Sequence, residues 1–294
     1  MNEETSAFVA AHRMENVRDL ALHAKRGGPV DMPVALDQIA GWQTARVKLP
    51  DWAACDGVVY PPHLSMEQCS SQATAHYKAE VARRVAGDDA ANGSLVDLTG
   101  GFGVDFSYMA RVFAHATYVE RQAHLCELAE HNMAALGLKD VAVVNDEAER
   151  FVGAMDPATL VFLDPARRDA HGARTYAIAD CTPNVLDLID TLLAKAPHVM
   201  VKLSPMLDWH KTLEDFDGLV HEIHIVSAKD ECKELLLVLD GSDGPRAPHV
   251  YCVNDDQRLD YDAAAYTRGL RIGEAPLPEN PRYLYEPNAS IMKA

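Results

Sequence analysis

The chain has 294 residues, of which 48% are hydrophobic, and its formal net charge is −17. Its length and composition allow a substantial buried core. No apolar run approaches the roughly 18 residues of a membrane span, and the acidic start Met1–Thr5 lacks the features of a signal peptide. We therefore expect a cytoplasmic protein without membrane contact. The net charge disfavours nucleic-acid binding unless a local basic patch compensates.

Residues 1–87 are predicted to form a helical region. Helix formers dominate Ala7–Ala24, which Gly27-Gly28-Pro29 ends. A short segment follows at Val34–Trp42, and Ser65–Ala86 is predicted as another helix, with Ser70 or Ser71 as a capping residue.

Residues 88–240 alternate short β-rich runs with helical stretches, which indicates parallel βαβ units. The predicted strands are Ser94–Leu98, Ala116–Glu120, Val141–Val144, Leu160–Leu163, His198–Lys202, His221–Val226 and Glu234–Leu239. The helices predicted between the first five strands are Phe106–Phe113, Ala123–Leu136, Ala148–Gly153 and Pro183–Ala196. Only Ser227–Lys233 joins the last two strands, which is too short for a helical crossover, so these strands should pair antiparallel. We predict an α/β fold with a Rossmann-like, doubly wound, seven-stranded sheet whose last strand is antiparallel.

Residues 241–294 are predicted to be a small C-terminal segment. Gly241–Pro245 has the composition of a linker, and His249–Val253 is a short strand candidate. The segment is too small for a convincing core of its own.

A glycine-rich turn follows the first predicted strand, in the run Val96-Asp97-Leu98-Thr99-Gly100-Gly101-Phe102-Gly103-Val104-Asp105. Glycines allow a ligand to approach the backbone, and ligands of open α/β sheets lie at the carboxyl ends of the strands. An ordinary tight turn is the alternative reading.

Further acids follow the next strands. Glu120 ends the second strand, where a carboxylate can accept hydrogen bonds from a ribose diol, although a surface Glu is the alternative. Asp146 follows the third strand, placed for an adenine amino group or for capping the next helix. The fourth strand leads into Asp164-Pro165-Ala166-Arg167-Arg168, and Lys202 lies at the end of the fifth. Five successive strand ends thus carry polar groups on one edge of the sheet.

This order resembles that of class I methyltransferases that use S-adenosylmethionine (SAM). Their first motif is commonly Asp/Glu-x-Gly-x-Gly-x-Gly; Asp97, Gly101 and Gly103 match it, and Thr99 replaces its first glycine. The resemblance covers about residues 65–240. It implies that SAM is the cofactor, held by Asp97, Thr99, Gly101, Gly103, Asp105, Glu120, Asp146 and Asp164.

A narrower resemblance is to bacterial methyltransferases that carry a C-terminal THUMP-like domain. It is carried by Leu64–Ala75, by Asp164–Arg168 and by the ending Tyr285–Ala294. In that family a small ferredoxin-like segment precedes the THUMP-like domain, so the chain is expected to end where that domain begins. THUMP domains bind RNA, and the resemblance implies tRNA or rRNA as the substrate.

The predicted catalytic residues are Asp164, Pro165, Arg167 and Lys202. Asp164 would face the methyl group, Arg167 would hold a phosphate or carboxylate unless it is merely solvated, and Lys202 would contact the substrate or pair with an acid. Enzymes that methylate base amines often have Asn/Asp-Pro-Pro-aromatic here; Ala166-Arg167 replaces Pro-aromatic, which lowers the expectation of amine methylation.

We expect no metal site, because the cysteines are scattered and His221 and His224 should point to opposite faces of a strand. Three alternatives stay open: a small-molecule methyltransferase, which suits the net charge, a non-catalytic SAM- or RNA-binding module, and a nucleotide-dependent oxidoreductase. The glycine pattern lacks the Gly-x-Gly-x-x-Gly spacing of the last class. The sequence does not predict the oligomeric state.

Overall fold

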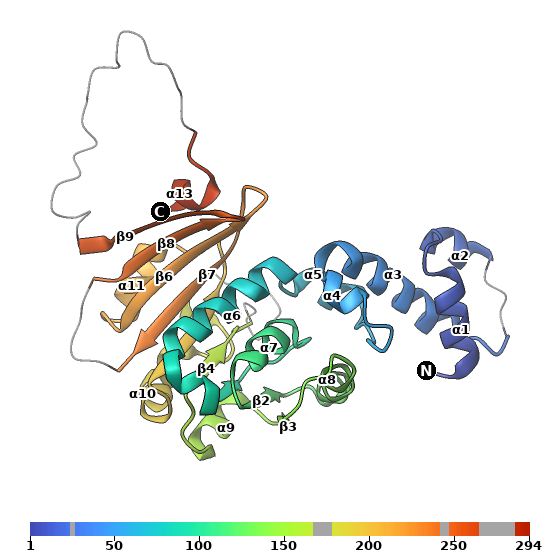
Figure 1. The fold of residues 1–294 in the computed structure, drawn as a ribbon, viewed down its shortest axis with the longest axis horizontal. Helices are drawn as coiled ribbons and strands as arrows, with labels where there is room; N and C mark the ends of the chain where they lie inside the picture. Colours follow the sequence, from blue (N-terminus) through green and yellow to red (C-terminus); the bar gives the residue numbers. More distant parts are fainter. Residues whose placement is uncertain (24–26, 167–177, 242–246, 265–285) are drawn as a thin grey trace, which may run out of the picture.

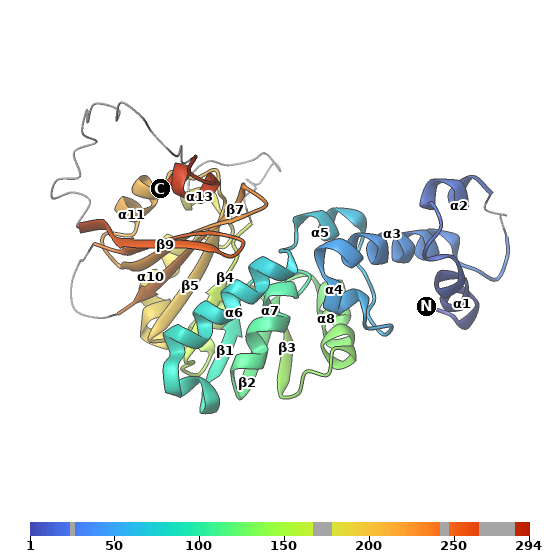
Figure 2. The ribbon, with the colours of Figure 1, turned by 45° about the horizontal axis from the view of Figure 1, so that its top comes forward.

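The fold is a single mixed β-sheet covered by helices on both faces, with helices α1–α5 extending from one side (Figures 1 and 2). A computed structural model describes residues 1–23, 27–166, 178–241, 247–264 and 286–294. The sheet order is β3-β2-β1-β4-β5-β7-β6-β8-β9. Its strands are β1 Ser94–Asp97, β2 His115–Glu120, β3 Val141–Asn145, β4 Leu160–Leu163, β5 His198–Leu203, β6 Val220–Ala228, β7 Glu231–Asp240, β8 His249–Asn254 and β9 Gln257–Asp262.

The sheet has nine strands, so the prediction of seven was wrong. The seven predicted strands are all present, and β7 is antiparallel to both β5 and β6 as expected. The open edge of β6 pairs in parallel with β8, and β9 folds back antiparallel on β8. An uncovered edge presents unpaired backbone groups to any neighbouring strand. Two strands beyond the predicted boundary at residue 240 therefore extend the same sheet.

The helices are α1 Glu3–His12, α2 Val17–His23, α3 Met32–Lys48, α4 Pro50–Ala53, α5 His63–Gln68, α6 Gln72–Ala86, α7 Val104–Met109, α8 Ala123–Ala135, α9 Ala148–Ala154, α10 Val185–Lys195, α11 Trp209–Asp215 and α13 Ala289–Lys293. The four helices predicted between the first five strands are present with ends shifted by at most about four residues, whereas α11 and α13 were not predicted. Short 3₁₀ turns lie at Gly87–Asn92, Ala110–Val112 and Ile178–Asp180.

Two of the long predicted helices are each divided in two by a capping residue. The Asn16 side chain accepts the backbone N–H of Arg18 at 2.9 Å, so Ala7–Ala24 is not one helix but parts of α1 and α2. Ser71 caps α6 by accepting the N–H of Thr74 at 3.2 Å, which separates α6 from α5. A side chain that satisfies the first free N–H groups begins a new helix at that point.

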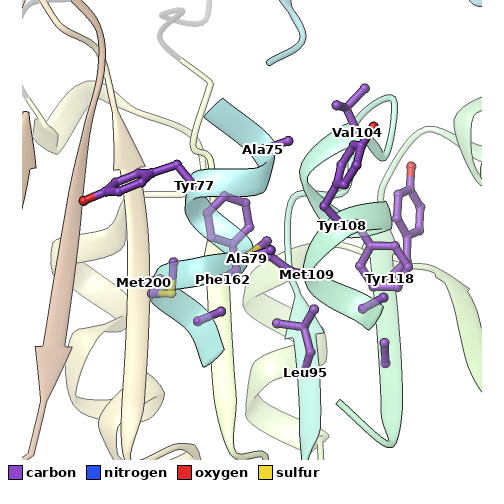
Figure 3. Packing of buried hydrophobic residues seen from close by; sticks show 14 of the residues in the cluster. Ala75, Tyr77, Ala79, Leu95, Val104, Tyr108, Met109, Tyr118, Phe162 and Met200 are labelled. Carbon is purple, nitrogen blue, oxygen red and sulfur yellow. The ribbon is translucent and has the colours of Figure 1, made fainter. Parts of the chain in front are cut away.

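Each face of the sheet has its own apolar core. On one face, α6, α7 and α8 pack over the strands; Figure 3 shows Ala79 of α6 and Met109 of α7 beside Phe162 and Leu95. On the other face, α9, α10, α11 and α13 cover buried residues such as Val161 and Val201. Strands β4 and β5 are therefore apolar on both faces, as their sequence predicts.

The order of strands reverses at β1, because β2 and β4 flank it and their crossover connections run in opposite directions. In open α/β sheets the loops beyond such a reversal diverge and leave a crevice at the carboxyl ends of the strands. The glycine loop after β1 and the Asp164 tip of β4 border this crevice.

Candidate active site

A cleft of about 1290 Å³ lies at the carboxyl ends of β1–β5. Every predicted site residue in the described part of the chain lines it: Asp97, Thr99, Gly101, Gly103, Asp105, Glu120, Asp146, Asp164, Pro165 and Lys202. Arg167 lies outside the described residues. The topology thus brings together side chains that are spread over more than a hundred positions of the sequence.

The glycine loop is shaped by the ring of Tyr118 in β2. A Cβ at Gly100 would lie 2.1 Å from that ring, so only glycine fits there. The Tyr118 hydroxyl donates to the carbonyl of Gly101 at 2.5 Å and fixes the turn from below. Gly101 and Gly103 have φ values of +54° and +83°, which glycine adopts without strain. The backbone beside Gly101 is open, since a Cβ built there would meet only the Thr99 carbonyl, at 3.7 Å.

Asp97 is a buried carboxyl group at the end of β1. Only 2% of it is exposed, and its Oδ1 accepts the backbone N–H of Thr99 at 2.9 Å. Within the part of the chain that the structure describes, Asp97 forms no ion pair. Burial, reinforced by the nearby Asp105, Asp164 and Glu120, raises the pKa of Asp97 to about 8. A buried acid with no cation beside it is suited to receive one from a ligand.

Glu120 and Asp146 continue this acidic edge at the ends of β2 and β3. Glu120 Oε2 accepts the N–H of Gly101 at 3.1 Å, which ties it to the glycine loop, and Oε1 accepts the N–H of Gln122 at 2.8 Å. Asp146 accepts the N–H of Glu147 and pairs with Arg150, and these bonds lower the pKa of Asp146. Carboxylate oxygens can accept more than one hydrogen bond each, so both acids retain capacity for a ligand.

On the other side of the cleft the buried charges are paired. Lys202 Nζ lies 2.5 Å from Asp164 Oδ2. The backbone N–H of Asp164 donates to the Thr99 hydroxyl at 2.6 Å, which ties the tip of β4 to the glycine loop. Burial alone would lower the pKa of Lys202, but Asp164, Asp105 and Glu234 outweigh burial and raise it. Lys202 is therefore an ammonium in this site.

A second buried lysine extends this arrangement inward. Lys78 of α6 is fully buried, lies 2.5 Å from Glu234 Oε1 in β7, and forms an ion pair with Asp105 Oδ1 at 3.2 Å that is too poorly aligned for a hydrogen bond. Asp105 Oδ2 accepts from the Ser70 hydroxyl at 2.7 Å and lies 3.5 Å from Lys202 Nζ. Despite burial, Lys78 and Lys202 lower the pKa of Asp105. We call Lys78, Asp105, Asp164, Lys202 and Glu234 the charged cluster.

Sequence reasoning missed Lys78, Glu234 and the special need for Gly100. Lys78 lies three residues after Ala75 and four before Ala82, both fully buried, so it is a charge on the apolar stripe of an amphipathic helix. Glu234 adjoins the buried run Leu235–Leu239. A charged residue within an apolar stripe indicates a buried partner, and that signal was available. The sequence around Gly100 does not reveal its contact with Tyr118, because pairing of β1 with β2 brings the two residues together.

The two histidines of β6 have separate partners. His221 pairs with Asp240 at 2.8 Å. His224 is enclosed by the Tyr77 hydroxyl at 2.7 Å and Glu222 at 3.1 Å, and it stacks on Tyr251. Among the described residues, no group of His, Cys, Asp and Glu side chains is arranged to hold a metal ion. In the same residues, no helix has both the length and the apolar character to cross a bilayer.

No protein-family model and no curated protein matches the sequence. Among solved structures, a protein from Porphyromonas gingivalis W83 that is assigned as a methyltransferase superposes with a TM-score of 0.81 and 26% identity, over 100% of this chain and 73% of that one. Fold and cleft together support a SAM-dependent methyltransferase with SAM as its cofactor.

Other solved structures match a little over half of the chain. A SAM-dependent methyltransferase from Agrobacterium tumefaciens matches with a TM-score of 0.42 and 16% identity, over 57% of this chain and 61% of that one. A Streptococcus mutans protein assigned as a methyltransferase, solved with the demethylated product SAH, matches with a TM-score of 0.42 and 11% identity, over 56% and 95%.

Proposed function

We propose that this chain transfers a methyl group from SAM to RNA. When bound, SAM supplies a methyl group already activated by a positive sulfonium, so the protein's task is chiefly to position the acceptor. The observation that carries the proposal is the division of one cleft into two unlike parts. The acids after β1–β3 provide anionic acceptors for a cationic donor, and the Asp164–Lys202 pair lies beyond them at the tips of β4 and β5.

The residues fit SAM on two structural grounds. The open backbone beside Gly101 leaves room for a ligand against the loop. The buried Asp97 carboxyl group has no cationic partner in the described residues, and the ammonium of SAM would supply one. In this proposal Asp97 receives the ammonium, Glu120 the ribose diol, and Asp146 the adenine amino group, with Thr99 and Gly103 completing the loop.

The size and rim of the cleft support a macromolecular acceptor. Its volume of about 1290 Å³ exceeds the roughly 300–1,000 Å³ of a typical small-ligand pocket, which leaves room for an acceptor besides SAM. Lys48, Lys229 and Lys233 line its rim, and Lys48 is held there by the carbonyls of Met66 and Glu67. These lysines, with Arg167 after the tip of β4, would contact phosphates. The THUMP-like resemblance adds support, since that domain class binds RNA.

A small-molecule acceptor is the second candidate, favoured by the net charge of −17. The test is to incubate the purified chain and labelled SAM with RNA from cells in which the gene has been deleted, and separately with a small-metabolite extract of the same cells. We expect methyl transfer to RNA and none to metabolites. Transfer to the metabolite fraction alone would replace the proposal with the second candidate.

A further inference from the structure

The charged cluster beside the cleft is more elaborate than the binding of SAM requires. It joins α6, α7, β4, β5 and β7 through two lysines and three acids, and Lys78 and Glu234 are almost completely buried. Burying charges is costly unless they are paired and held in good geometry. The cost of burying this cluster is understandable if the cluster holds one lysine and one acid in fixed positions beside the methyl acceptor.

The pair presented to the cleft is Lys202 and Asp164. Lys202 has three N–H donors; one bonds Asp164, Asp105 lies 3.5 Å away as an ion-pair partner, and the Lys202 side chain is 13% exposed. Asp164 uses Oδ2 for Lys202, while Oδ1 has no hydrogen-bond partner in the described residues, and its side chain is 40% exposed. The ammonium and a carboxylate oxygen therefore lie side by side, and each retains hydrogen-bonding capacity for a substrate.

This combination suits an acceptor atom that accepts and donates hydrogen bonds at once. A hydroxyl oxygen has one proton to give and lone pairs to receive with. An exocyclic base amine presents only donors, so the Lys202 ammonium beside it would be unmatched. The tip after Asp164 continues as Pro165-Ala166 and offers no aromatic ring on which a base could stack. A ribose needs no such ring.

We propose that the methyl acceptor is a ribose 2′-hydroxyl of RNA, activated by Asp164 and Lys202. This inference rests on the proposed function and names its acceptor atom. The hydroxyl proton passes to the free oxygen of Asp164, and the hydroxyl oxygen forms the new bond to the methyl carbon. The bond from that carbon to sulfur breaks, and its electron pair stays on sulfur. Lys202 stabilises the negative charge that develops on the oxygen as the proton leaves.

Lys78 and Glu234 complete the arrangement without touching the substrate hydroxyl. Glu234 lies 2.5 Å from Lys78 and lines the cleft wall, and Lys78 also compensates Asp105. Because the Lys78 ammonium pairs with both Glu234 and Asp105, it holds the Asp105 carboxylate where it faces Lys202. The inner lysine therefore acts as a structural counter-charge for the outer pair.

Alkaline hydrolysis tests the acceptor atom directly, because alkali cleaves RNA only where the 2′-hydroxyl is free. RNA labelled by the full chain with [methyl-³H]SAM is digested with alkali, and we expect the label in resistant dinucleotides. Label in mononucleotides would overturn the 2′-hydroxyl assignment while leaving RNA methylation in place. SAM binding without transfer to any RNA would overturn both the inference and the function on which it rests.

A variant series tests the role of Lys202. Lys202→Met should lower the single-turnover rate of transfer at least about 100-fold while the Kd for SAM stays within about threefold of wild type. The matched control is Lys211→Met: Lys211 is exposed, its ion-pair partners in the described chain are Glu214 and Asp215 of its own helix, and the variant should transfer at the wild-type rate. An unchanged rate in Lys202→Met would refute the role of this lysine. If that variant does not fold, the alkali digest of wild-type product still decides the acceptor atom.

Discussion

The two sides of the cleft handle charge in opposite ways. On the side of β1–β3, Asp97 is buried with no cationic partner in the described chain, and its pKa rises to about 8. On the side of β4, β5 and β7, Lys202 and Lys78 lie between acids, and the pKa of Asp105 falls although it is buried. An uncompensated buried acid is a place for an incoming cation, whereas a compensated cluster keeps its geometry before the ligand arrives.

The largest effect is expected on the paired side. Asp164→Asn should lower the rate of methyl transfer by about 10²- to 10⁴-fold, because the amide cannot take the acceptor's proton. The Kd for SAM should change little, since Asp164 is already paired with Lys202. Single-turnover kinetics and calorimetry measure the two quantities. A large loss of SAM affinity with an intact rate at saturation would show that the two sides are not functionally distinct.

On the unpaired side, Asp97→Asn should weaken SAM binding by about 10- to 100-fold, the value of a hydrogen bond to a charged group. The same change should stabilise the free protein. Because the folded pKa of Asp97 lies above its unfolded value, wild type loses stability as the pH rises from about 4 to about 8. The stability gained by the variant should therefore be largest at pH 8 and above.

Calorimetry with SAM and thermal melts at pH 5 and pH 8 measure both effects of Asp97→Asn. The exposed Asp190 of α10 provides the control variant, Asp190→Asn, which should change neither. Equal melting shifts at the two pH values would contradict the raised pKa of Asp97.

The affinity for SAM should also depend on pH. Below pH 8 the free protein holds a proton on Asp97, and the incoming ammonium favours the ionised form, so binding releases a proton. The affinity should rise with pH toward about 8, by at most about tenfold per unit. Calorimetry in buffers of different ionisation enthalpy detects the proton directly. Asp97→Asn should abolish the part of this pH dependence that arises from ionisation of Asp97.

The smallest effect is expected from the glycine loop between the two sides. Gly100→Ala would place a Cβ 2.1 Å from the Tyr118 ring, and overpacking of this kind costs about 1–3 kcal/mol in the free energy of unfolding. Gly153→Ala in α9 is the matched control, because nothing lies within 4 Å of its added Cβ and alanine favours a helix. Urea denaturation of both variants measures the difference. Equal stabilities of the two variants would show that the Tyr118 ring moves to make room for the added Cβ.

Much of the fold could be predicted because its signals are local. Apolar runs such as Leu160–Leu163 specify buried strands, and the short connection Ser227–Lys233 forces β6 and β7 to pair antiparallel. The strand ends at Asp97, Glu120 and Asp164 could be placed on one edge because parallel strands end on the same side. The continuation of the sheet beyond residue 240 could not be predicted in this way, since pairing of β8 with β6 depends on a sheet edge formed by residues distant in sequence.

The sequence alone determined the alternation of strands and helices, the glycine turn and the row of acids, because hydrophobic period, backbone freedom and chain direction act over a few residues. Only the tertiary structure decided which charges are paired. Lys78 and Glu234 are separated by 156 positions in the sequence, yet they lie 2.5 Å apart. The energy of a buried charge depends on what surrounds it in space, so Asp97 and Asp105, which flank one loop, acquire opposite shifts of pKa.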